Sequence, residues 1–157
     1  TYTSSNRWEN SYALYLVSTT TAAAFKTPNI KEVMTISATA ATGTINYDIT
    51  TQSALYYTTN ASGNFTVNLR GSSGTTLNTV MATGEVMTVT FLVTNGATAY
   101  YNNVIQVDGT TSGVTTKWLG GTAPTSGNAS AIDVYTYAVI KTGSATFTVI
   151  ASQTKAA

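Results

Sequence analysis

The sequence contains no cysteine and no histidine. The missing cysteine excludes disulfide bonds, thiolate metal sites and thiol chemistry, and the missing histidine removes the commonest general base. A glycosidase would need two carboxylates that face each other across a cleft. Asp48 and Asp133 fall inside predicted strands, where alternation is expected to turn both side chains outward. We therefore expect no catalytic residues and no enzyme activity from the six carboxylates Glu9, Glu32, Asp48, Glu85, Asp108 and Asp133.

Charged residues make up only 8% of the chain, against about 25% in typical soluble domains. The net charge is +1 and no basic cluster occurs, so we expect no nucleic-acid partner. No apolar run approaches the ~18 residues of a membrane span, and no signal sequence is seen at the amino terminus, so we expect no membrane association. Thr1 fits either removal of an initiator methionine or a fragment cut from a longer chain.

Cofactor and metal motifs are also missing from the sequence. It has no phosphate-binding loop, no dinucleotide fingerprint and no nucleophile elbow, so no cofactor is expected. The segment Asp108-Gly109-Thr110-Thr111 has the start of a calcium loop but lacks its alternating acids and closing glutamate. A turn is the better interpretation, and no metal site is predicted.

What the sequence does contain is threonine, its commonest residue, and a strict alternation of apolar and polar positions. Both favour β-strands, each with one face on a core. Alternation is seen in segments 12–17, 33–39, 45–49, 65–69, 86–94, 134–139 and 147–150. Glycine and asparagine turns separate these segments, which predicts an all-β, antiparallel, jelly-roll-like β-sandwich of 8–10 strands.

Two further features complete the predicted organisation. Leu77, Val80 and Met81 have helical spacing between Thr75 or Thr76 and Gly84, which predicts one short helix near 76–82. Residues 1–11 are polar and irregular apart from Trp8, so we expect an amino-terminal arm, followed by a single sandwich domain over 12–157.

Aromatic residues are the candidate contact residues. The doublets Tyr56-Tyr57 and Tyr100-Tyr101 should place one ring on each face of a strand. The residues proposed to contact a glycan or a second subunit are Trp8, Tyr57, Tyr101 and Trp118. Sugars stack on exposed rings, but tyrosine is also enriched where subunits meet, and this second interpretation is preferred.

Long strings of the sequence resemble a module of marine phage proteins, cyanophages especially. The resemblance covers Thr27 to Glu85, the string KWLGGTAPTSGNASAID (Lys117 to Asp133) and the string IKTGSATFTVIASQT (Ile140 to Thr154). Related sequences occur in virion structural and tail-fibre-like proteins. The resemblance implies a place on the virion surface, but no functional residues can be carried over from it.

Together these features predict a non-enzymatic virion structural protein, either a head decoration or a subunit of a fibre or appendage. It would act as a homotrimer whose outward threonine and tyrosine rows meet, with Trp8 in the arm anchoring a neighbour. Expected partners are the major capsid protein or a tail or neck component, and a host surface glycan if the chain forms a fibre tip. The alternatives are a carbohydrate- or receptor-binding module, and a bacterial adhesin or pilus domain with an internal lysine–asparagine bond at Lys31, Lys117 or Lys141.

Overall fold

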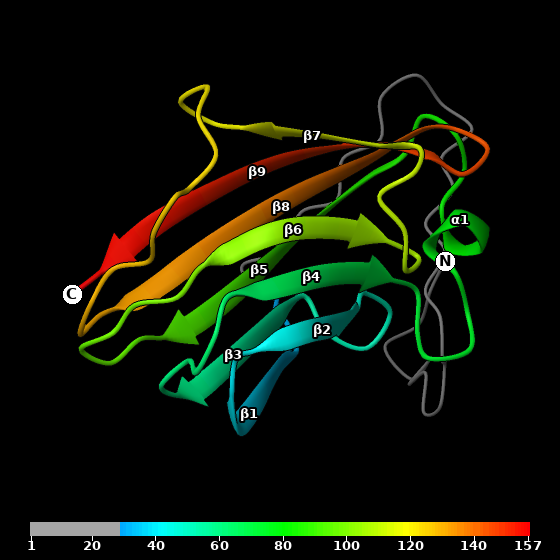
Figure 1. Cartoon of the computed structure of the whole chain (residues 1–157). Helices are drawn as coiled ribbons and strands as arrows, with labels where there is room; N and C mark the ends of the chain where they lie inside the picture. Colours follow the sequence, from blue (N-terminus) through cyan, green and yellow to red (C-terminus); the bar gives the residue numbers. More distant parts are fainter. Residues whose placement is uncertain (1–28) are drawn as a thin grey trace, which may run out of the picture. The chain divides into compact units, whose positions relative to one another are not determined.

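The computed structural model describes residues 29–157, and those from Lys31 to Ala157 form one compact unit. This part of the chain contains nine strands and one short helix (Figure 1). Their bounds are β1 Met34–Ala40, β2 Gly43–Asp48, β3 Ala54–Thr59, β4 Phe65–Arg70, α1 Leu77–Val80, β5 Val86–Thr94, β6 Asn102–Val107, β7 Val114–Trp118, β8 Ile132–Gly143 and β9 Thr146–Ala156.

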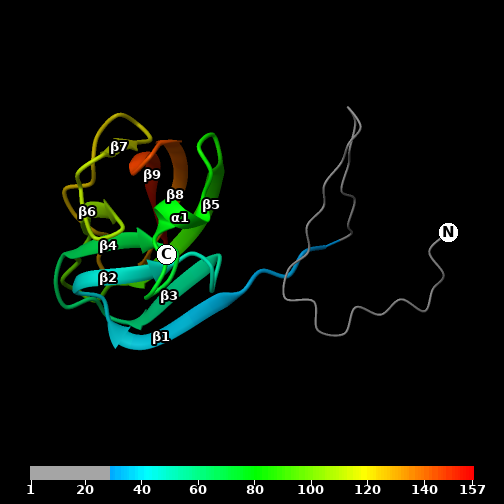
Figure 2. The ribbon, with the colours of Figure 1, turned by 90° about the vertical axis from the view of Figure 1, so that its right-hand side faces the viewer.

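The strands form two sheets, and from β1 to β6 the chain alternates between them. The large sheet has the order β1-β3-β5-β8-β9-β7 and the small sheet the order β2-β4-β6 (Figure 2). Neighbours within a sheet are therefore two strands apart along the chain and run parallel, as in β1/β3/β5 and β2/β4/β6. Strand β8 runs antiparallel to β5 and β9, and β7 runs parallel to β9.

This topology confirms the all-β class and the short helix but corrects the predicted antiparallel jelly roll. Alternation and turn residues locate strands, but they do not say which sheet the next strand joins. The turn at Gly43, where φ is +59°, carries the chain from the large sheet to the small one instead of closing a hairpin. The predicted arm at 1–11 and the predicted strand at 12–17 lie outside the described residues.

The core lies between the inner faces of the two sheets and is rich in aromatic rings. Phe65 of the small sheet packs edge-on against Phe91 and Tyr135 of the large sheet, with centroids 5.7 and 5.9 Å away. Tyr137 stacks on Tyr135 at 6.2 Å, and Tyr57 packs edge-on against Phe91 at 5.5 Å. Each such pair contributes about 0.5–1.5 kcal/mol beyond the burial of its area, so this cluster holds the two sheets together.

Three core tyrosines have hydroxyl groups that are hydrogen-bonded inside the fold. The Tyr47 hydroxyl donates to the Thr90 carbonyl at 3.1 Å, and the Tyr137 hydroxyl donates to Asn102 Oδ1 at 3.2 Å. The Tyr135 hydroxyl accepts the main-chain N–H of Asn102 at 3.2 Å. Burial raises the pKa of Tyr47, Tyr135 and Tyr137 well above the ordinary value of 10.0, because a phenolate would be poorly solvated there.

Strand β1 differs from the other predicted strands, because its apolar side chains face solvent. Thr35 lies beside buried Leu55, whereas Ile36 lies beside Tyr56 on the opposite face of the sheet. The exposed fractions of Met34 and Ile36 are 45% and 67%. The expectation that these residues pack on the core is wrong, because the register of β3 places the threonine on the inner face.

We predict that the protein loses stability above pH 10. The three core tyrosines would ionise near 10.0 in the unfolded chain but stay protonated in the fold. Their contribution to the free energy of unfolding is therefore constant below that pH and falls above it, by up to about 1.4 kcal/mol per pH unit for each tyrosine. Urea unfolding followed by circular dichroism between about pH 8 and about pH 11 measures this decline. Equal stability at both ends of that range would contradict it.

Candidate interaction surface

The carboxylates of residues 29–157 are all bound by local donors or a cation. Glu32 accepts from the Ser53 hydroxyl at 2.9 Å, and Glu85 accepts from the Ala82 N–H at 2.8 Å. Asp48 forms an ion pair with Arg70 at 2.5 Å on the small sheet. In this part of the chain no group of three or more acidic side chains could hold a metal ion. Glu9 lies outside the described residues.

The position of Asp133 corrects the expectation that its side chain points outward. It shares the odd-numbered, inward face of β8 with Tyr135 and Tyr137 and is fully buried. Its oxygens accept hydrogen bonds from the Asn95 amide at 3.0 Å, the Gln153 amide at 3.0 Å, and the main-chain N–H and side-chain amide of Asn128. Asp133 therefore links β8 to β9, to the segment after β5 and to the segment before β8. This is a structural role.

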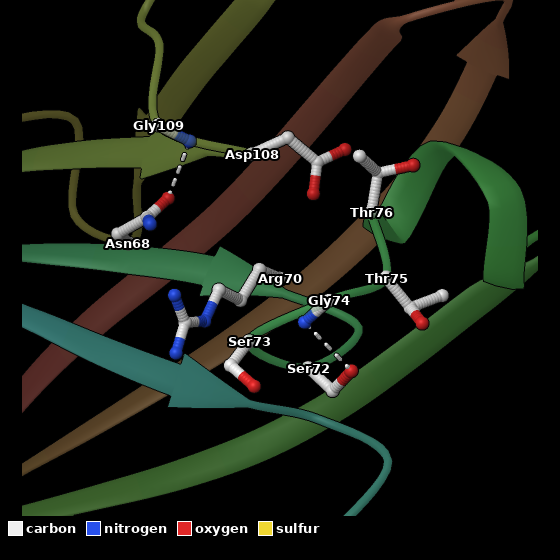
Figure 3. A pocket seen from close by; sticks show the side chains of 9 residues that line it. All are labelled: Asn68, Arg70, Ser72, Ser73, Gly74, Thr75, Thr76, Asp108 and Gly109. Atoms are coloured by element: carbon white, nitrogen blue, oxygen red, sulfur yellow. Dashed lines mark hydrogen bonds between the residues drawn. The ribbon is translucent and has the colours of Figure 1, made fainter.

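A hollow of about 380 Å³ lies where β4 and β6 end, beside the loop 72–76 (Figure 3). Both oxygens of Asp108 are occupied there by the N–H groups of Leu77 and Asn78, at 2.6 and 3.0 Å. The Gly109 N–H donates to Asn68 Oδ1 at 2.7 Å, and φ is +52° at Asp108 and +80° at Gly109. The predicted turn at Asp108-Gly109 is thus confirmed.

The hollow offers little to a ligand. Its one cationic side chain, Arg70, is paired with Asp48, and the carboxylate of Asp108 is already engaged. The residues that line it include no aromatic ring on which a sugar could stack: Asn68, Arg70, Ser72, Ser73, Gly74, Thr75, Thr76, Asp108 and Gly109. This hollow is therefore a weak candidate for the functional site.

The predicted contact residues are spread over the fold. Tyr57 lies on the inner face of β3 against Phe91, and Trp118 ends β7, partly buried beside Ala151. Three strands of the large sheet, β5, β8 and β9, separate Tyr57 from Trp118, so these two rings do not form one platform. Tyr101 is partly exposed in the loop before β6, where its N–H donates to Asn64 Oδ1 at 3.2 Å. Trp8 lies outside the described residues.

The feature that sequence analysis missed is the outer face of the large sheet, the face turned away from the small sheet. Strand register aligns Ile36, Tyr56, Leu92 and Val134 in one row across β1, β3, β5 and β8. Val86 and Ile140 form a second apolar pair between β5 and β8. The alternation had shown apolar residues at these positions, but which face each set occupied depended on the register between strands.

Hydroxyl groups, not charges, make up the rest of this outer face. Thr90 lies opposite Thr136 between β5 and β8, and Thr136 lies opposite Ser152 between β8 and β9. Among the outward positions of the six described strands of the large sheet, Lys117 on β7 is the one charged residue. The face is therefore a broad, nearly uncharged surface of threonine and partly exposed apolar side chains.

Comparison with known proteins adds no relative to this picture. No family model, no curated protein and no solved structure matches the chain. None of the helices described here is both long enough and apolar enough to cross a membrane.

We predict that Asp133→Ala destabilises the fold by about 3 kcal/mol or more, because buried amide donors lose their acceptor. Asp48→Ala is the matched control. It removes a carboxylate from a partly exposed ion pair, which is worth about 1 kcal/mol or less. The free energies of unfolding of both variants are measured by urea titration. Equal losses in the two variants would contradict a special structural role for Asp133.

Proposed function

We propose that this protein is a non-enzymatic structural subunit that works by assembling with copies of itself through the outer face of the large sheet. The observation that carries the proposal is the chemistry of that face. Charged residues are almost absent from it, and the apolar row of Ile36, Tyr56, Leu92 and Val134 crosses four of its six strands. Net charge is what usually keeps monomers apart, and here it is only +1 for the whole chain.

Threonine rows suit contact between copies for a physical reason. A hydroxyl group donates and accepts, so one threonine face can satisfy another without the opposite charges that two different proteins would need. Cross-strand threonine pairs stabilise a sheet locally, by roughly 0.2–1 kcal/mol each. The same face can therefore remain folded in water and still be covered by a second copy at small desolvation cost.

The place of assembly is proposed from the sequence. The resemblance of Thr27 to Glu85, and of the two later strings, to virion structural and tail-fibre-like phage proteins supports a location on the surface of a phage particle. There the subunit would be a head decoration or part of a fibre, most simply a homotrimer, bound to the major capsid protein or to a tail or neck component. Labelling of the parent phage with antibodies against this chain, followed by electron microscopy, tests this location.

The alternative functions receive less support from the geometry. A glycan-binding module would need an exposed aromatic platform, and Tyr57 and Trp118 lie on strands too far apart to build one together. For a pilus domain, the Nζ of Lys141 is the buried amine, and it donates to the main-chain carbonyls of Asn78 and Met81. Lys31 and Lys117 are exposed. Binding to a host surface glycan remains compatible with the proposal if the chain forms a fibre tip.

We predict that Leu92→Lys reduces the assembly to at most two copies, because it places a charge at the centre of the apolar row. Thr44→Lys is the matched control, since Thr44 is exposed on the small sheet. Light scattering during size-exclusion chromatography at micromolar concentration measures the particle mass. Three copies, or a multiple of three, are expected for the unmodified protein and for Thr44→Lys. An unmodified protein that is monomeric would contradict the proposal.

A further inference from the structure

Within residues 29–157, strand β1 presents a free main-chain edge. It is the first strand of the large sheet and pairs only with β3 in the described part of the chain. The Val33 carbonyl accepts the N–H groups of Ser53 and Ala54, at 3.0 and 3.3 Å. Because main-chain groups alternate in direction along a strand, those of Met34 and Ile36 point away from β3. This edge therefore offers a row of donors and acceptors to another strand.

The other three sheet edges carry the features that discourage such pairing. Asp48 ends β2 in an ion pair, and Lys117 lies on β7, which has only five residues. Asn103 and Gln106 give β6 a polar exterior. Strand β1 has seven residues with the sequence MTISATA, which contains no charge and no proline. Natural proteins protect edges with charge, proline or short length, and β1 uses none of these.

Exposed apolar side chains also gather at this edge. The exposed fractions of Val33, Met34 and Ile36 are 62%, 45% and 67%. The remaining large apolar side chains that are exposed in residues 29–157 are Ile30, Val80, Val86 and Leu119. An edge strand with both unpaired main-chain groups and exposed apolar side chains is a site for strand addition.

We propose that β1 pairs antiparallel with β1 of a second copy, about a two-fold axis at Thr35. The regular part of the edge is 33–37, because the register shifts between Ser37 and Ala40, and Thr35 is its midpoint. With the axis at Thr35, Met34 of each copy lies opposite Ile36 of the other copy. Two such apolar pairs therefore form on the outer face. The Thr35 hydroxyls face each other on the inner face, and Val33 lies opposite Ser37.

Several properties of β1 favour its own copy as the partner. A two-fold axis brings the same edge together in antiparallel direction, so the free groups of Met34 and Ile36 satisfy those of the second copy. Apolar side chains then meet apolar ones, and no like charges are opposed within 33–37. A shift of one residue between the two copies of β1 would place threonine opposite the apolar side chains. This cost fixes the register. The two large sheets would become one continuous sheet.

This contact is distinct from the proposed function. The proposed trimer is centred on Leu92 of the outer face, whereas the two-fold contact needs the main-chain groups of β1; Ile36 takes part in both. Each can therefore fail without the other. Together they would link trimers in pairs or into a larger lattice on a surface.

Cysteine cross-linking tests the two-fold contact directly, because the native chain contains no cysteine. In the proposed register, the Thr35 Cα atoms of the two copies lie about 4.5 Å apart, within disulfide range. Thr35→Cys should therefore be recovered mostly as a disulfide-linked dimer on non-reducing gels after mild oxidation. Thr44→Cys is the control, an exposed threonine on the edge strand of the small sheet. It should remain monomeric on the gel.

Failure of Thr35→Cys to cross-link, with an unchanged melting curve, would overturn the contact. Equal cross-linking of the two variants would overturn it as well, because the reaction would then reflect random collision.

A charge variant separates the edge contact from the face contact. In the Leu92→Lys background the edge contact should leave a dimer, and adding Ile36→Lys should reduce that dimer to a monomer. Adding Leu119→Lys instead is the control, since Leu119 has the same exposed fraction of 67% as Ile36. It should leave the dimer intact. A Leu92→Lys protein that is already monomeric would contradict the edge contact, whereas a monomeric unmodified protein would contradict both contacts.

Discussion

The small sheet has three strands and the large sheet has six. This difference in size determines most of the surface that the protein exposes to its surroundings. The small sheet packs against the large sheet through Phe65, Phe91 and Tyr135, and the core is complete there. At β1 the buried core ends, and Thr35 and Ile36 are both exposed. The two sheets are thus tightly packed around the aromatic cluster, whereas the edge of the large sheet at β1 is exposed.

The alternation of the chain between two sheets is the origin of this shape. Each crossing adds one strand to the sheet that the chain enters, so β1 to β6 contribute three strands to each sheet. The remaining strands, β7, β8 and β9, all join the large sheet, and the sheets become unequal. A sheet grown in this way has parallel neighbours, and parallel sheets are normally covered on both faces. Within residues 29–157 no other element covers the outer face of this large sheet, which is unusual for its topology and supports the proposal that further copies contact it.

Hydroxyl groups allow this protein to keep such a face in water. Threonine packs on a pleated surface as a branched apolar residue does, but its hydroxyl group remains hydrated. The outer face therefore needs little charge to stay soluble, and it can be covered without burying ions. Buried polarity is confined to fully satisfied sites such as Asp133, whose oxygens bind the amides of Asn95, Asn128 and Gln153. In the described part of the chain, no buried side-chain nitrogen or oxygen lacks a partner.

The sequence by itself determined six of the nine described strands, the short helix and much of the core, because alternation along one strand is a local property; β3, β6 and β7 were not among the alternating segments. It correctly placed Phe65, Val67 and Leu69 on one face, and Tyr135, Tyr137 and Val139 on another. It misjudged Asp133, which alternation along β8 places on the inward face with Tyr135 and Tyr137. Only the tertiary structure decided which strands became neighbours, which face of β1 met solvent and how apolar residues from four strands joined into one row. These depend on register between segments far apart in the chain, and a shift of one residue reverses every side chain without changing the pattern in the sequence.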